Sequence, residues 1–254
     1  MTPSGRTAFA IIPARGGSKG LLGKNTRPLA GYPLISWSIA VAHATGLFDA
    51  VIVTTDSEEI GRIAKRFGAL TCRRPPELAS DTALVKDAVR HCLEHVELDL
   101  GQPNYLVLLQ PTSPLRKPGD IVDCITAMEE VDADSATSFR LADEPIERAY
   151  RIENGHPVPA INGQDNWLPR QLLPDYYYLN GAVYVVRTSA FLSDPTSSFL
   201  FGKQVSSIMP SERSIDIDTA SQFRLAELMM SESDYIKPVE TEPEPPEDRV
   251  FDYG

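Results

Sequence analysis

Four glycines and three basic side chains stand together directly after the first apolar run of the chain. The segment reads Pro13-Ala14-Arg15-Gly16-Gly17-Ser18-Lys19-Gly20-Leu21-Leu22-Gly23-Lys24-Asn25. Glycines let a backbone turn tightly and present its N–H groups to an anion. Arg15, Lys19 and Lys24 add positive charge to a chain whose formal net charge is −11. Such a loop after a buried strand predicts a di- or triphosphate site at the edge of an open α/β sheet.

Two familiar phosphate-binding patterns do not fit this loop. A Walker A loop requires Gly-x4-Gly-Lys-Ser/Thr, but Ser18 and Asn25 stand where the first glycine and the hydroxyl belong. The dinucleotide pattern Gly-x-Gly-x-x-Gly does not occur in it either. The sequence therefore favours neither a P-loop NTPase nor an NAD enzyme. From the residues alone, a flexible loop with incidental lysines stays open as the alternative.

Short apolar runs alternate with helical patterns through the first half of the chain. The runs are typical of strands buried on both faces of a parallel sheet. We expect strands at 9–13, 51–54, 105–109, 135–139 and 179–186, and helices at 34–44, 57–67, 82–96, 118–130 and 219–230. This order predicts an α/β fold with a doubly wound, mostly parallel sheet of the Rossmann-like type.

We predict one domain over residues 8–230 with an insertion at 141–178. Prolines and the pairs Asn154-Gly155 and Asn162-Gly163 interrupt the alternating pattern there, which indicates an arm or lid with hairpin turns. Residues 238–254 form an acidic, proline-rich tail with six Asp and Glu against one Arg. This composition predicts a disordered tail, or one that docks as an extended strip.

Charge and cysteine content limit the class of protein. The 24 Lys and Arg against 35 Asp and Glu argue against a nucleic-acid partner, because such binding depends on basic surfaces. We expect no signal peptide, and no apolar stretch approaches the ~20 residues of a membrane span. The three cysteines are scattered, which favours a reduced, cytoplasmic compartment.

Asp216 and Asp218 alternate with Ile215 and Ile217. In an extended segment this alternation directs both carboxylates to one face. Two carboxylates near a phosphate loop suit Mg²⁺, which takes one or two carboxylates together with substrate phosphates and water. The competing interpretation is that Asp218 caps a helix beginning near Thr219, although capping leaves Asp216 unexplained.

The glycine-rich loop and five further motifs resemble those of the acylneuraminate cytidylyltransferases, the CMP-sialic acid synthetase family. The further motifs are residues 74–82, 109–116, 169–171, 180–182 and 214–219, so the resemblance extends over about residues 9–227. It implies a Rossmann-like nucleotidyltransferase with an inserted dimerisation arm, acting as a homodimer that exchanges its arms. It also implies that CTP and a nine-carbon 2-keto acid sugar react at a Mg²⁺ site and release pyrophosphate.

The same resemblance gives roles to individual residues. Arg15, Lys19 and Lys24 are implied to be catalytic, holding the triphosphate and stabilising the leaving pyrophosphate. The implied nucleotide-binding residues are Ala14, Arg15, Gly16, Gly17, Ser18, Lys19, Lys24, Asn25, Arg74, Ser80, Asp81, Thr82 and Ala83. The implied sugar-binding residues are Gln110, Arg170, Asn180 and Tyr184, and the implied metal ligands are Asp216 and Asp218.

Several alternatives remain open at this point. The competing interpretation of Arg74 is a solvated surface charge. That of Ser80 or Asp81 is a helix cap, and that of Tyr184 is ordinary core packing. Tyr178 departs from the family pattern near the sugar site, so the sugar is the least defined part of the prediction. A transferase acting on an octulosonic acid, and a catalytically silent CTP-binding sensor or assembly subunit, are the alternative functions.

Overall fold

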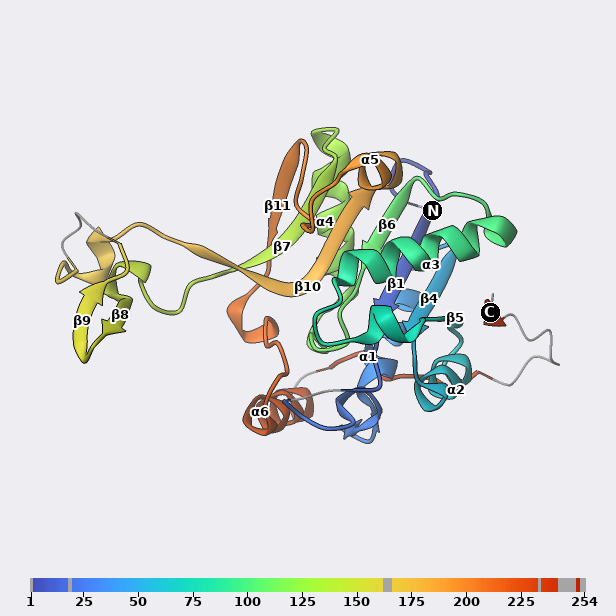
Figure 1. The fold of residues 1–254 in the computed structure, drawn as a ribbon, viewed down its shortest axis with the longest axis horizontal. Coiled ribbons are helices and arrows are strands. Elements are labelled where there is room, and N and C mark those ends of the chain that lie inside the picture. Colours follow the sequence, from blue (N-terminus) through green and yellow to red (C-terminus); the bar gives the residue numbers. More distant parts are fainter. Residues whose placement is uncertain (1, 18–19, 162–165, 233, 242–249, 252–254) are drawn as a thin grey trace.

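The computed structural model describes residues 2–17, 20–161, 166–232, 234–241 and 250–251 of the 254-residue chain. Its described residues form an eight-stranded sheet (Figure 1). In spatial order the strands are β11 (Gln204–Ile208), β7 (Ser135–Leu141), β10 (Tyr177–Arg187), β6 (Tyr105–Leu108), β1 (Ala8–Pro13), β4 (Ala50–Thr55), β5 (Leu70–Arg73) and β12 (Val250–Phe251). Only β10 runs antiparallel to its neighbours within this sheet. The predicted doubly wound, mostly parallel sheet is confirmed.

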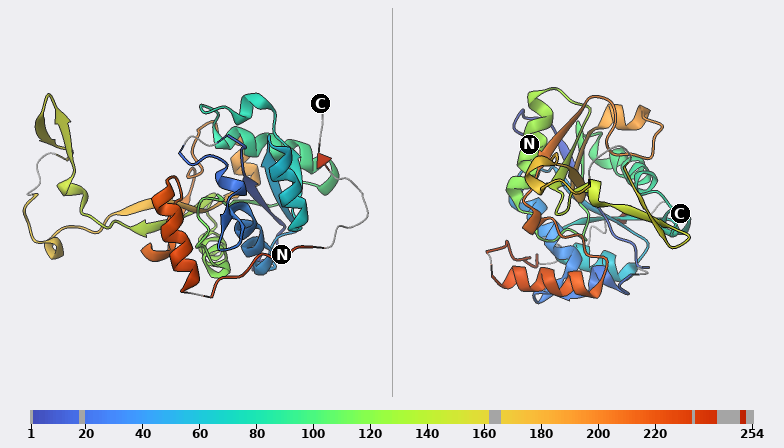
Figure 2. Two further views of the ribbon diagram at one scale, coloured as in Figure 1. Left: turned by 90° about the horizontal axis from the view of Figure 1, so that it is seen from below. Right: turned by 90° about the vertical axis from the view of Figure 1, so that its left-hand side faces the viewer.

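Helices cover both faces of the sheet, as Figures 1 and 2 show. They are α1 (Leu34–Thr45), α2 (Glu58–Arg66), α3 (Val85–Leu100), α4 (Pro118–Glu130), α5 (Thr188–Ser193) and α6 (Ala220–Ser231). Alternate residues of β1 face opposite layers. Ala10 and Ile12 pack with α1, α2 and α4, whereas Phe9 and Ile11 pack with α3 and α5. Both faces of β1 are therefore core, which explains its continuous apolar run.

The predicted strands agree with the structure to within about two residues. β5 and β11 of the main sheet were not expected, nor were the two-residue strands β2 (Pro28–Leu29) and β3 (Tyr32–Pro33), which pair with each other. β5 and β11 have only four and five residues. The third helix begins at Val85 rather than near Thr82, and Leu84 precedes it without a side-chain cap. The segment before it forms a short 3-10 helix, η2 (Pro76–Ala79). The capping interpretation of Ser80 and Asp81 is therefore wrong.

An arm links β7 to β10 and projects from the body of the molecule in Figure 1 and in the left view of Figure 2. It contains η3 (Ile146–Arg148), β8 (Tyr150–Glu153), β9 (His156–Pro159) and η4 (Arg170–Leu172). Asn154 and Gly155 have φ angles of 51° and 82°, as a tight hairpin turn between β8 and β9 requires. The second Asn-Gly pair lies in 162–165, outside the described residues.

The chain returns to the body after α6. The Thr241 N–H donates to the Arg66 carbonyl over 2.9 Å, and Glu240 pairs with the Arg66 guanidinium at 2.7 Å. Val250 and Phe251 then pair in parallel with β5, so this part of the predicted tail forms a strand. Residues 242–249 and 252–254 lie outside the described residues. Among the helices that are described, none combines the length and apolar character that a membrane crossing requires.

Candidate functional site

A cavity of about 330 Å³ lies beside the loop that follows β1. Doubly wound sheets bind ligands at this position, beyond the carboxyl ends of their strands. The described residues that line it are Pro13, Arg15, Gly20, Lys24, Asn25, Arg74, Val85, Gln110, Pro111, Thr112, Asp216 and Asp218. Residues of four separate sequence motifs therefore meet around one space.

Backbone contacts hold the beginning of the glycine-rich loop. The Ala14 N–H donates to the Thr54 carbonyl over 3.0 Å, and the buried Asn25 donates its amide to the Arg15 carbonyl over 3.0 Å. Gly16 and Gly17 are exposed. Ser18 and Lys19, implied as phosphate-binding residues, lie outside the described residues.

Arg15 connects the loop to the segment around residue 80. Its guanidinium donates to Asp81 Oδ1 over 2.9 Å and to the Ser80 carbonyl over 3.2 Å. Thr82 and Ala83 continue this segment, and the Ala83 N–H donates to the Ser80 carbonyl over 3.3 Å. Of this group, only Arg15 is among the described residues that line the cavity.

Arg74 is a buried charge in the cavity wall. Its side chain is only 5% exposed, so the interpretation as a solvated surface charge is wrong. The guanidinium donates to the Thr54 carbonyl over 2.9 Å. Burial lowers the pKa of Arg74, and the nearby charge of Asp56 opposes that effect. A guanidinium is chemically able to donate to the carbonyl oxygen and ring nitrogen of a base.

The two aspartates lie together in the cavity wall. Lys24 Nζ donates to Asp218 Oδ1 over 3.0 Å and to the Ile217 carbonyl over 2.7 Å. Burial raises the pKa of Asp216, a hydrogen bond from Thr112 lowers it, and the charge of Asp218 raises it further. Within the described part of the chain, the buried Asp216 Oδ1 has no hydrogen-bond partner.

The donor set fits a magnesium ion. A buried carboxylate oxygen without a partner is costly unless a cation or donor satisfies it, and Mg²⁺ completes its shell with phosphates and water. The described residues contain no group of three or more His, Cys, Asp or Glu placed for a metal, so a site at Asp216 and Asp218 would need those further ligands. The N-cap of α6 is Thr219, which accepts from the Gln222 N–H, so the capping interpretation of Asp218 is wrong.

The four implied sugar-binding residues lie in different surroundings. Gln110 lines the cavity, and a Cβ on Gly181, whose φ is +72°, would lie 2.6 Å from its Oε1. Asn180 is buried beneath, donating to Ser214 Oγ and accepting from the Ala182 N–H. Tyr184 packs on the Phe199 ring at 5.7 Å. Arg170 belongs to η4 in the arm.

The sequence reasoning did not assign five residues of the cavity wall. They are Pro13, Gly20, Val85, Pro111 and Thr112. Gly20 is explained by close approach, because a Cβ there would lie 2.4 Å from the Asp218 carbonyl oxygen. Thr112 lies two positions after Gln110 in the same motif, which was the available signal.

A doubly wound sheet whose first loop is glycine-rich and basic, and which faces paired aspartates, has the features of a nucleotidyltransferase. Residues 9–194 match the family model described as "Cytidylyltransferase", and the chain belongs to this family. It is 33% identical over 219 residues to the N-acylneuraminate cytidylyltransferase of Escherichia coli O18:K1:H7, covering 86% of this chain and 51% of that protein. The chain thus spans about half the length of that relative.

Two further comparisons agree with this family. The chain is 34% identical over 239 residues to the CMP-N,N'-diacetyllegionaminic acid synthase of Legionella pneumophila, covering 87% of this chain and 95% of that protein. Its fold is similar to that of CMP:2-keto-3-deoxy-manno-octonic acid synthetase complexed with CTP. That comparison has a TM-score of 0.67 and 18% identity, and covers 89% of this chain and 99% of that one.

Proposed function

We propose that this protein transfers CMP from CTP to the anomeric hydroxyl of a sialic-acid-like nonulosonic acid and releases pyrophosphate. The observation that carries the proposal is the single cavity in which Arg15, Lys24 and Arg74 meet Asp216 and Asp218. Positive groups beside a glycine-rich loop suit a triphosphate, and paired carboxylates suit the metal that accompanies it. The named relatives act on sugars of this class.

Each residue of the cavity would have a role in CMP transfer that follows from its chemistry. Arg15 and Lys24 would bind the phosphates and stabilise the negative charge that moves onto pyrophosphate as the α-phosphorus is attacked. Arg74 would donate to cytosine O2 and N3. Gln110 would orient the sugar. Lys19 is proposed to join the phosphate-binding group on the resemblance of its motif.

Asp216 and Asp218 would hold Mg²⁺, which when bound neutralises phosphate charge. Lys24 contacts Asp218 in this structure, so a bound ion would compete with Lys24 for that carboxylate. Lys24 would then turn toward the phosphates. Asp216 keeps an oxygen directed to no described partner, which supports its role as a ligand.

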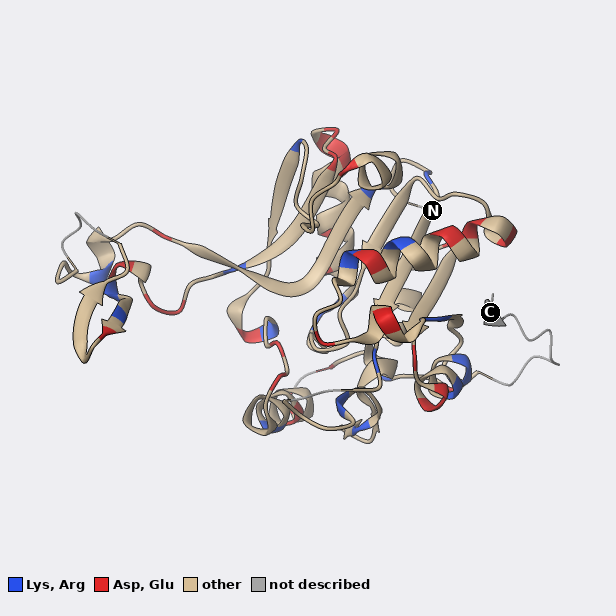
Figure 3. Cartoon of the chain, in the orientation of Figure 1, with Lys and Arg blue, Asp and Glu red and all other residues tan. Residues whose placement is uncertain are grey.

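We also propose a cytoplasmic homodimer in which each arm reaches the site of the other copy. The arm exposes Ile152 (69%), Trp167 (88%) and Leu172 (67%), an apolar surface that a partner would bury. Basic residues lie on the same arm around β8 and β9 (Figure 3). Arg170 on η4 would pair with the carboxylate of an acidic sugar in that neighbouring site.

Pyrophosphate release tests the reaction directly. The protein is incubated with Mg²⁺, CTP and each of N-acetylneuraminic, legionaminic, pseudaminic and octulosonic acids, with UTP and ATP in parallel. We expect release with CTP and a nine-carbon acid. Release with octulosonic acid alone contradicts the proposed sugar class. CTP binding without release for any acid favours the silent sensor instead.

A further inference from the structure

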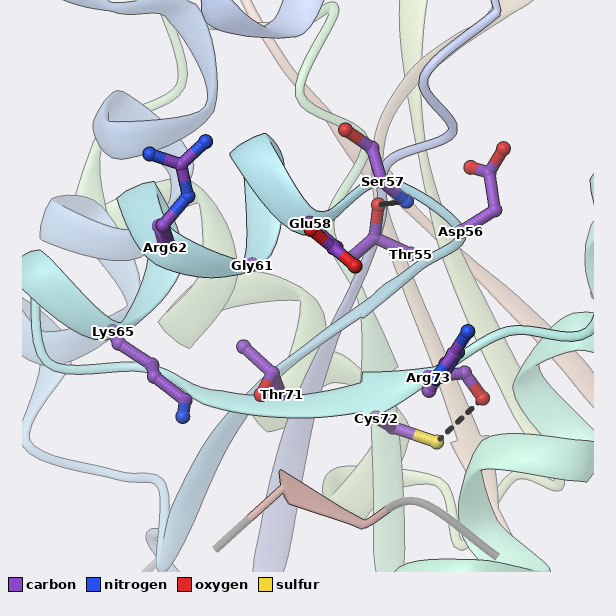
Figure 4. A pocket seen from close by; sticks show the side chains of 10 residues that line it. All are labelled: Thr55, Asp56, Ser57, Glu58, Gly61, Arg62, Lys65, Thr71, Cys72 and Arg73. Carbon is purple, nitrogen blue, oxygen red and sulfur yellow. Dashed lines mark hydrogen bonds between the residues drawn. The ribbon is translucent and has the colours of Figure 1, made fainter. Parts of the chain in front are cut away.

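A carboxylate lies directly behind the glycine-rich loop. Asp56 follows β4, and its Oδ1 accepts a hydrogen bond from the Gly16 N–H over 2.8 Å. Asp56 also lines a neighbouring cavity of about 350 Å³ together with Thr71 and Cys72, and Figure 4 shows its side chain directed away from those two residues. Asp56 is not among the described residues that line the proposed nucleotide cavity. Its contact with the glycine-rich loop is the hydrogen bond to Gly16.

The loop approaches this carboxylate closely. A Cβ on Gly16 would lie 3.1 Å from Ser57 Cβ and 3.8 Å from Asp56 Oδ2. Ser57 is itself fixed, because its N–H donates to Thr55 Oγ1 over 3.1 Å and its Oγ caps α2 by accepting from the Ile60 N–H. Asp56, which accepts from the Gly16 N–H, therefore immediately precedes the N-cap of helix α2.

Arg15 lies between two backbone groups that are bound to the end of β4. The Ala14 N–H donates to Thr54, and the Gly16 N–H donates to Asp56. These two bonds define the backbone on either side of Arg15, and so the direction in which its side chain leaves. The peptide between Arg15 and Gly16 is held at both of its polar atoms, because Asn25 also donates to the Arg15 carbonyl. Loss of the Asp56 bond leaves only the Asn25 contact to hold it, so Arg15 is oriented less firmly.

The negative charge of Asp56 also affects a neighbouring side chain. The charge of Asp56 raises the pKa of Arg74 against the lowering effect of burial. A carboxylate in contact with a triphosphate would repel it. Asp56 lies outside the lining of the nucleotide cavity, so it can accept from the Gly16 N–H without contact with a nucleotide in that cavity.

We propose that Asp56 is a positioning residue for cytidylyl transfer, fixing the Gly16 N–H and thereby aiming Arg15 at the phosphates. This inference rests on the proposed function. It assigns a role to the residue after the second parallel strand, 40 positions from the glycine that it holds.

The test compares Asp56→Ala with Asp56→Asn, which keeps an oxygen acceptor, and with Glu58→Ala, which removes a carboxylate two positions away. For Asp56→Ala we expect kcat to fall by about tenfold, because an Arg15 that is oriented less firmly stabilises the departing pyrophosphate less. The KM of the sugar should stay unchanged. Asp56→Asn should keep most of kcat, and Glu58→Ala should match the wild type.

The outcomes separate this inference from the proposed function. A wild-type protein without turnover contradicts the proposed function itself. Active wild type with an equally active Asp56→Ala contradicts only the role of Asp56, as does an equal loss in Asp56→Asn. If Asp56→Ala does not fold, the ¹⁵N–¹H shift of Gly16 decides: a shift unchanged between wild type and a third variant, Asp56→Ser, overturns the proposal.

Discussion

Asp216 gives the clearest prediction at the scale of single residues. Burial raises the pKa of its carboxyl in the folded protein above the value in the unfolded chain. The folded state therefore binds this proton more tightly, and stability is lost as the pH rises from the unfolded toward the folded pKa. At pH 7 without Mg²⁺ we expect Asp216→Asn to raise the Tm. Calorimetry in metal-free buffer checks this, and a lower Tm contradicts it.

A substitution of Gly20 changes the shape of the same site without removing a charge. An added Cβ would lie 2.4 Å from the Asp218 carbonyl oxygen, so Gly20→Ala must push the loop away from the aspartates. Displacement of reacting groups by about 1 Å can cost about 10²-fold in rate, and we expect a loss of that order in kcat/KM. Gly119→Ala on α4, where the Cβ would meet nothing within 4 Å, is the matched control. Equal activity of the two variants would refute the argument.

Residue patterns predicted the loop and the aspartates because their chemistry is local. The basic glycine loop and the Asp-x-Asp alternation are visible within a few positions. Asp56 and Asn180 are different. Their roles depend on contacts between distant segments, such as the Gly16–Asp56 bond across β1 and β4. No local sequence pattern shows that the side-chain amide of Asn180 donates hydrogen bonds to Ser214 and Met209.

At the scale of elements, α6 holds the aspartate segment in place through its capping box. Thr219 Oγ1 accepts from the Gln222 N–H, and Gln222 Oε1 accepts from the N–H groups of Asp218 and Thr219. We expect Thr219→Ala to lower the free energy of unfolding by about 1 kcal/mol. Urea denaturation measures this, with Thr219→Ser as the variant that keeps the cap. A destabilisation by Ser as large as that by Ala would argue against capping.

Burial and composition of the strands explain which of them the sequence revealed. β1, β4 and β6 are buried on both faces and read as continuous apolar runs. β11 lies at the sheet edge with alternating exposed residues. β5 has the same length as β6, four residues, but it contains Thr and Arg and ends in an exposed residue, so it does not read as an apolar run. β12 has only two residues and lies in an acidic, proline-rich segment, so its pairing with β5 is what identifies it as a strand.

At the scale of the whole molecule, the position of the arm bears on how many copies of the chain build one site. Arg170 lies on η4, and the arm projects away from the body that holds the cavity (Figures 1 and 2). A sugar-binding role for Arg170 therefore requires a second copy. Ile152 and Trp167 are exposed on the same arm. Under the proposed arm exchange, the double variant Ile152→Asp, Trp167→Asp should sediment as a monomer where the wild type is a dimer.

Mixed dimers test whether the arm acts on the other subunit. Arg170→Ala and Lys24→Ala should each be inactive as pure dimers, because every site lacks one of the two groups. Random pairing of equal amounts makes half the dimers mixed, and each mixed dimer has one site with both groups intact and one with neither. Co-expression should therefore restore about one quarter of the wild-type activity. If Arg170 serves its own subunit instead, every site keeps its lesion and the mixture stays as inactive as its parents.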